Sequence, residues 1–197
     1  MEMKGGLAVK KRWFCLGIIA VAALIAAIYS IPYSIKSDFS NKNTIYKQVE
    51  SRMPRGANIV LYDETAVGTA QKHGAILMGV IEGDEEQLGV VLLEKGLNGR
   101  YKISGISYGD GNYHWRIFQE AEGDYCVFYG RNGLSSAVNR IDVPYGHSVY
   151  HFYPLNHPLP FMMTMYLGES QEGAWIDASE VRFYDREGND ITDTVTP

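Results

Sequence analysis

Residues 75–93, AILMGVIEGDEEQLGVVLL, hold two apolar runs on either side of a charged turn. Residues 75–80 and 90–93 carry almost no polar side chain, whereas residues 83–86 are mostly acidic. Short apolar runs bounded by turn residues are typical of central strands that are covered on both faces. This stretch therefore predicts two buried strands joined by a solvated hairpin turn.

The same spacing continues along the chain from Asn58 onward. Apolar or alternating runs are separated by glycine-containing turns about every ten residues, the pattern of an antiparallel all-β meander. Asn98-Gly99 can supply the positive φ angles of a tight hairpin. The expected strands are residues 58–63, 75–82, 87–95, 100–108, 113–121, 125–130, 138–143, 148–153, 161–167, 174–177 and 181–185.

One helix is expected before the strands, over residues 41–53. Ile45, Val49 and Met53 recur every four residues and so share one helical face. Pro54 and Gly56 end the helix, because the residue before a proline is biased out of the helical conformation. The apolar face allows this helix either to lie against the β domain or to act as a stalk.

Residues 13–33, WFCLGIIAVAALIAAIYSIPY, carry no charged side chain. At about 1.5 Å per residue such a helix reaches roughly 31 Å, close to the thickness of the hydrocarbon core of a bilayer. Lys10, Lys11 and Arg12 precede it directly, which predicts a transmembrane helix with a cytoplasmic N-terminus. The alternative is a cleaved signal peptide, although the apolar run exceeds the usual length of a signal core.

The predicted organisation follows from these segments. Residues 1–12 are cytoplasmic, 13–33 form the transmembrane helix, 34–56 hold the juxtamembrane helix and linker, and 57–197 form an extracytoplasmic β domain. The expected fold class is mainly β, an antiparallel meander that forms a small sandwich or barrel with one N-terminal helix.

The part beyond residue 33 is acidic. It holds 14 Lys and Arg against 22 Asp and Glu, a net charge of −8. Binding to phosphate backbones depends on neutralisation by Lys and Arg, so a nucleic-acid partner is not expected. Cys15 lies in the predicted span and Cys126 in a strand, so no intrachain disulfide is expected and Cys126 is predicted to be a core residue.

The most unusual surface candidate is residues 144–160, which combine aromatic, histidine and proline residues. Aromatic side chains in a stiff loop give a large contact area at low entropic cost, so Tyr150, His151 and His157 are the predicted ligand-binding residues. The alternative is a pair of core strands joined by a rigid loop. No metal site or cofactor is expected, because His147 and His151 in one strand would lie roughly 13 Å apart.

Catalytic motifs are not evident. Ser148, His114 and Asp124 supply the residue types of a hydrolytic triad, but the sequence holds neither a Gly-x-Ser-x-Gly elbow nor a Ser-x-x-Lys pair. No catalytic residue is therefore predicted.

Residues 100–105, 109–112 and 127–132 resemble small membrane-anchored envelope proteins of Gram-positive bacteria whose function is unassigned. The resemblance extends over residues 75–135 and implies the same topology and placement in the cell envelope. It carries no functional residues.

The sequence favours a membrane-anchored extracytoplasmic binding or accessory module. Membrane lipid around residues 13–33 and a protein at the cell surface are its expected partners. The alternatives are a membrane-tethered hydrolase, which needs a cleft with a histidine bonded to a serine or carboxylate, and a structural subunit of a membrane complex.

Overall fold

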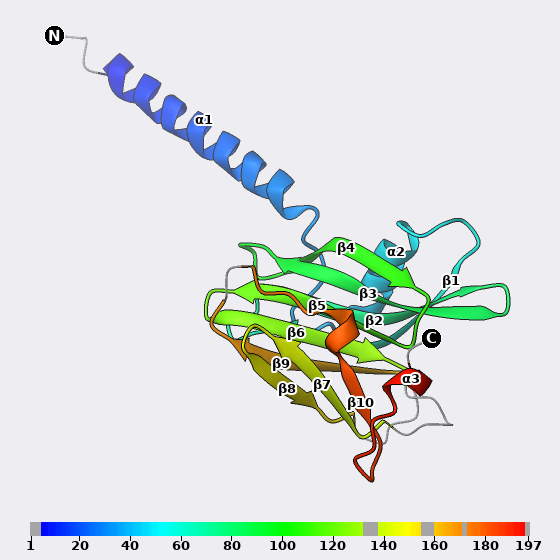
Figure 1. Ribbon diagram of the computed structural model, residues 1–197. Coiled ribbons are helices and arrows are strands. Elements are labelled where there is room, and N and C mark those ends of the chain that lie inside the picture. The colour runs from blue at the N-terminus through cyan, green and yellow to red at the C-terminus, as the bar shows by residue number, and fades with distance from the viewer. Residues whose placement is uncertain (1–4, 132–137, 155–159, 171–172, 196–197) are drawn as a thin grey trace.

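Layered antiparallel sheets make up most of the molecule, and one long helix leaves them at the N-terminus (Figure 1). The computed structural model describes residues 5–131, 138–154, 160–170 and 173–195, with side chains from Leu16 onward. The mainly β, antiparallel fold expected from the sequence is confirmed.

The first sheet contains the stretch that predicted the fold. In the order β1-β2-β3-β4, each strand pairs antiparallel with the next, so this sheet is a meander. Ala75 lies opposite Leu92 and Leu77 opposite Val90, which brings the two apolar runs together. The strands are β1 (Asn58–Val67), β2 (His73–Glu82), β3 (Glu85–Lys95) and β4 (Tyr101–Gly109).

Two further sheets follow along the chain. The middle sheet has the order β5-β6-β9 and consists of β5 (Tyr113–Glu120), β6 (Gly123–Gly130) and β9 (Phe161–Gly168). The third sheet has the order β10-β7-β8 and consists of β7 (Arg140–Tyr145), β8 (Ser148–Phe152) and β10 (Arg182–Tyr184).

Alternating side chains of β2 and β6 show how the sheets are stacked. Leu77 of β2 packs in one cluster with Val127 of β6, between the first and middle sheets. The next residue of β6, Phe128, faces the other way and packs with Ile141 and Phe152 of the third sheet. The strand β6 is therefore covered on both faces. The same holds for β2, as its apolar run predicted, because Ile76 and Met78 belong to a further cluster on its other face.

Cys126 lies on the same face of β6 as Phe128 and is buried. Burial raises the pKa of its thiol to about 12, so the thiol is neutral and unreactive. The prediction that Cys126 is a core residue is confirmed.

The helix α2 (Lys42–Glu50) covers the outer face of the first sheet. Its Ile45 and Val49 are buried against Ile76 and Met78 of β2, so the helix lies against the domain and is not a stalk. The preceding linker is also attached, because Ile35 exchanges backbone hydrogen bonds of 3.0 and 2.8 Å with Tyr101.

The helix α1 (Gly5–Ser30) extends away from the sheets (Figure 1). Its described large apolar side chains are about half exposed or more, and Ile19, Leu24 and Ile25 are each at least 60% exposed. Within the described residues, no helix combines the length and the apolar character needed to cross a membrane.

Two details differ from the expected fold. The strands form three open sheets, not one small sandwich or barrel. The expected strand at residues 174–177 is wrong, because these residues lie outside the sheets and lead into a short 3-10 helix, η1 (Ala178–Glu180). Asp177 accepts hydrogen bonds from the Ser179 backbone N–H (2.9 Å) and hydroxyl (2.8 Å), and such local bonds replace those of a sheet.

A short helix, α3 (Thr192–Val195), closes the described part of the chain. Val195 is buried in the same cluster as the third sheet.

Candidate functional site

Tyr150 and His151, two of the predicted binding residues, lie on β8 at one edge of the third sheet. Consecutive strand residues point to opposite faces, so the two side chains do not form one surface. Tyr150 packs against the core and donates a hydrogen bond to the Leu167 carbonyl, which is a structural contact. His157, the third predicted residue, lies outside the described residues.

His151 faces outward from the third sheet and is half exposed. Its Nδ1 lies 2.6 Å from Oδ1 of Asp142, and Nε of Arg140 lies 2.9 Å from the same oxygen. Val149 and Tyr153 are exposed beside it. Where the structure describes side chains, no group of three His, Cys, Asp or Glu residues is placed to hold a metal ion.

A pocket of about 280 Å³ lies between the first and middle sheets, where β4 ends and β5 begins. The chain changes sheet at this point, so the edges of the two sheets face each other without being paired. The residues around the pocket are Ser107, Tyr108, Gly109, Tyr113, His114, Trp115, Arg116 and Tyr129.

Strand alternation decides which of these side chains face the gap between the sheets. Tyr113 and Trp115 pack toward the third sheet, as members of the cluster around Phe128. His114 and Arg116 therefore point the opposite way, toward the first sheet. His114 stacks on Tyr129, with ring centroids 5.3 Å apart.

Arg116 connects the two sheets across the pocket. Its Nη2 donates a 2.6 Å hydrogen bond to the Ser107 hydroxyl of β4. A guanidinium has five donors, so others remain for a ligand. Because Ser107 contacts a cation and not a base, its hydroxyl is not activated as a nucleophile.

His114 contributes an acceptor to the same pocket. Burial lowers the pKa of its imidazole, so the ring is neutral at neutral pH. Its Nε2 lies 3.3 Å from the Gly111 carbonyl, which can only accept, so Nε2 carries the proton and Nδ1 is an acceptor. No carboxylate is among the described lining residues, which leaves Arg116 as the charge there.

A second cavity of about 150 Å³ lies on the other side of the β4–β5 turn and shares Gly109 with the pocket. Its charged side chains and Gln87 are already paired. Arg131 contacts Glu86 at 2.5 Å, and Gln87 donates to Asp110 at 2.8 Å. These pairs hold the turn in place and leave the first pocket as the better binding site.

Two carboxylates are buried elsewhere in the middle sheet. Oε1 of Glu120 accepts from the His73 backbone N–H at 3.1 Å and lies 2.9 Å from Nδ1 of its ring. Its other oxygen has no hydrogen-bond partner among the described atoms. Asp124 accepts hydrogen bonds from the hydroxyls of Tyr145 and Ser170.

Sequence reasoning missed both the pocket and the His73–Glu120 pair. His114 was considered only as part of a triad with Ser148 and Asp124, and Asp124 faces the third sheet instead. The alternation of His114 and Arg116 with Tyr113 and Trp115 was the available signal, because it predicts a polar face on β5.

The chain was compared with protein-family models, with curated proteins and with solved structures. None of the three comparisons finds a match.

Proposed function

We propose that this chain is a single-pass membrane protein of a bacterial envelope, with its N-terminus in the cytoplasm and a β domain that acts outside as a binding or accessory module. The absence of charge from residues 13–33 and the basic residues before them support the anchor. The exposed apolar side chains of α1 support it further, because the β domain does not cover them. The envelope is supported by the resemblance of residues 75–135.

The observation that carries the binding role is the pocket around Arg116 and His114. It offers a cation with free donors, a neutral acceptor and a stacked aromatic ring, but no activated nucleophile. This combination suits a small ligand that carries negative charge or hydrogen-bond acceptors.

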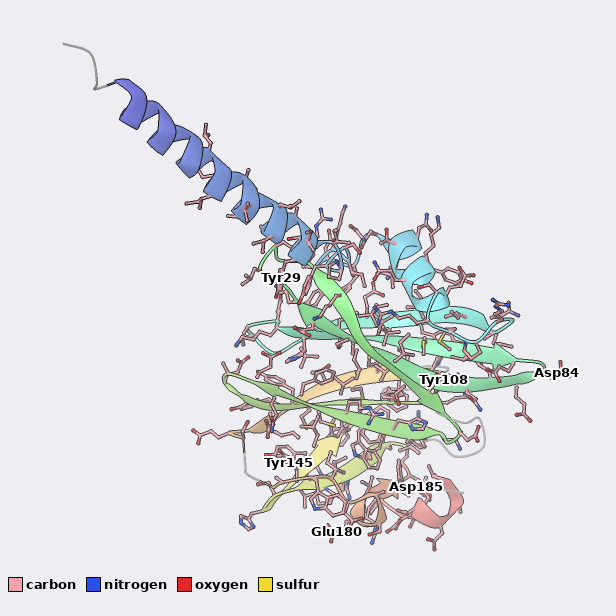
Figure 2. The ribbon with its side chains drawn as sticks, turned by 90° about the horizontal axis from the view of Figure 1, so that it is seen from above. Tyr29, Asp84, Tyr108, Tyr145, Glu180 and Asp185 are labelled. Atoms are coloured by element: carbon pink, nitrogen blue, oxygen red, sulfur yellow. The ribbon has the colours of Figure 1, made fainter. Side chains whose placement is uncertain are left out.

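The position of the pocket agrees with such a role. The strand β4 begins at Tyr101, which is bonded to the linker after α1, and ends at Gly109 beside the pocket. Figure 2 shows Tyr108 at the end of this strand that lies away from Tyr29. Nine strand residues span about 30 Å, so the length of β4 separates the pocket from the linker that follows α1.

A membrane-tethered hydrolase is the second candidate, and the His73–Glu120 pair is the observation that favours it. A buried carboxylate that orients an imidazole supplies two of the three members of a catalytic triad. Within the described contacts, however, no hydroxyl or thiol is hydrogen-bonded to the His73 ring, because the Tyr101 hydroxyl reaches only the backbone carbonyl of His73, at 3.5 Å. The binding module therefore remains the first proposal.

Crosslinking in intact membranes tests the binding role. The photoreactive residue p-benzoylphenylalanine replaces His114 in the pocket or Tyr153 on the exposed face of β8, and crosslinked products are recovered by pull-down. Products specific to His114 support the pocket. Products formed only with the residue at position 153 support the surface predicted from the sequence. If neither position gives a crosslinked product, the binding role is contradicted.

A protease experiment tests the anchor. Protease added to protoplasts under unfolding conditions should digest the chain beyond Ser34 and leave an N-terminal tag protected. Recovery of a soluble mature form that begins near residues 28–34 would show a cleaved signal peptide instead.

A further inference from the structure

The turn between β3 and β4, residues 96–99, has an apolar tip. Leu97 is 95% exposed, more than any other large apolar side chain described. Single exposed leucines are common on protein surfaces, so exposure alone indicates nothing. The position of this turn beside α1 and the basic residues around it indicate a role.

The turn packs against the segment that follows α1. The Asn98 side-chain amide donates a 3.2 Å hydrogen bond to the Tyr33 carbonyl. Gly96 lies against the Tyr33 ring so closely that an added Cβ would sit 2.6 Å from a ring carbon. Tyr33 in turn stacks on Tyr29 of α1, with centroids 5.4 Å apart. Figures 1 and 2 both show the β3–β4 turn beside the end of α1.

The charge around this turn is opposite to that of the domain. Lys95, Arg100 and Lys102 against Glu94 give a local net charge of +2, whereas residues 34–197 carry −8. Lys102 lies over the Tyr33 ring, 4.9 Å from its centroid, and pairs with Glu94 at 3.2 Å. Lys95 and Arg100, on either side of the apolar tip, have no ion-pair partner among the described residues, and the Lys95 ammonium lies 5.7 Å from the centroid of the Tyr101 ring.

We propose that this turn inserts Leu97 into the interface of the bilayer that α1 crosses, and that Lys95 and Arg100 lie against phospholipid headgroups. An apolar tip flanked by basic residues is the pattern of interfacial membrane contacts. With α1 as one attachment and the turn as a second, the β domain has a fixed orientation, and the pocket at the far end of β4 faces away from the membrane. This inference rests on the membrane anchor proposed above.

Fluorescence quenching in liposomes tests the contact with the full chain. Cys15 is replaced by serine, and the buried thiol of Cys126 stays unlabelled. An environment-sensitive fluorophore is attached at Leu97→Cys, at Leu24→Cys in α1 or at Asp84→Cys in the β2–β3 turn, which Figure 2 shows at the opposite end of the first sheet. The liposomes are phosphatidylcholine, with or without phosphatidylglycerol. Nitroxide lipids labelled near the headgroup quench the labels at positions 97 and 84, and nitroxide lipids labelled deep in the acyl chain quench the label at position 24, which lies near the middle of the proposed span.

The label at position 97 should emit at shorter wavelength and lose roughly half of its intensity, as expected within about 10 Å of the acyl boundary. Phosphatidylglycerol should increase this loss, and Lys95→Gln with Arg100→Gln should abolish the increase. The label at position 84 should remain unquenched. Circular dichroism checks that each variant keeps its fold.

The label at position 24 separates the two proposals. Quenching at position 24 without quenching at position 97 would overturn the contact and leave the anchor standing. No quenching at position 24 would overturn the anchor and this inference with it. An equal effect of Lys47→Gln with Arg55→Gln, two basic residues outside the turn, would overturn the assignment of the headgroup contact to Lys95 and Arg100.

Discussion

Two histidine–carboxylate pairs in this molecule make the same contact at different depths below the surface. Nδ1 of His73 lies 2.9 Å from Glu120, and Nδ1 of His151 lies 2.6 Å from Asp142. The Glu120 carboxylate is fully buried and that of Asp142 is 15% exposed, and the His73 ring is 32% exposed against 49% for His151. The shorter contact is therefore the one that water screens, and burial is a better guide than distance to what each pair contributes.

The two pairs also connect different parts of the fold: one joins two sheets, and the other joins neighbouring strands of one sheet. Glu120 lies at the end of β5 and binds both the ring and the backbone N–H of His73 at the start of β2, so it connects the middle sheet to the first. Asp142 and His151 are direct neighbours in the register of β7 and β8, whose backbones already hold them together. Loss of the first pair should affect tertiary structure, whereas loss of the second should not.

Replacing Glu120 by alanine should have the largest effect. The backbone N–H of His73 then loses its acceptor, and an unsatisfied buried group costs about 1–3 kcal/mol. Urea unfolding followed by circular dichroism measures this loss.

Glu120→Gln is the matched control. It retains an acceptor oxygen at the same position, so it should keep more stability than the alanine variant. If Glu120→Ala unfolds at the same urea concentration as the unmodified chain, the buried pair contributes nothing and the comparison fails.

Tyr150→Phe should have the next largest effect. This change removes the hydrogen bond to the Leu167 carbonyl, which joins β8 to the middle sheet, and costs about 1 kcal/mol. The same unfolding experiment measures it. A variant that loses ligand crosslinking while its stability is unchanged would show that Tyr150 belongs to a binding surface after all.

His151→Ala should change stability by less than about 1 kcal/mol, because exposed ion pairs contribute little. The measurement is the shift of the urea midpoint, at low and at high salt. A larger loss that persists at high salt would mean that the outer face of the third sheet is less solvated than its exposure indicates.

Most of the secondary structure could be predicted from the sequence, because strands and helices follow local patterns of apolar residues. The apolar runs at residues 75–80 and 90–93 predicted central strands, and the period of Ile45 and Val49 predicted the buried face of α2. The error at residues 174–177 arose where the side chain of Asp177 satisfies nearby backbone and hydroxyl donors and no strand lies alongside.

The division into three sheets and the presence of the pocket could not be predicted from the sequence in this way. Alternation shows that Val127 and Phe128 point to opposite sides, but not which sheet covers each side. Glu120 meets His73 across 47 positions of sequence, and Arg116 meets Ser107 only because β4 and β5 belong to different sheets. Such contacts depend on how layers stack, which no local pattern encodes.

Replacing Glu122, two residues beyond Glu120, by glutamine should have the smallest effect on stability, and this effect should depend on pH. At the exposed β5–β6 turn it accepts 2.7 Å hydrogen bonds from the backbone N–H and the hydroxyl of Thr69. These bonds, the hydroxyl bond above all, lower the pKa of Glu122 from 4.5 to about 2. Its ionised form is therefore the one that holds the turn to residues 69–70.

The sign of the pH dependence follows from this lowered pKa. The contribution of Glu122 to stability is fully present above about pH 4.5 and is lost as the pH falls toward 2. The difference in melting temperature between the unmodified chain and Glu122→Gln should be constant from pH 7 to 5 and vanish near pH 2. Other carboxylates titrate in the same range, so only this difference reports on Glu122. A difference that persists unchanged to pH 2 would show that the hydrogen bonds, and not the charge, hold the turn.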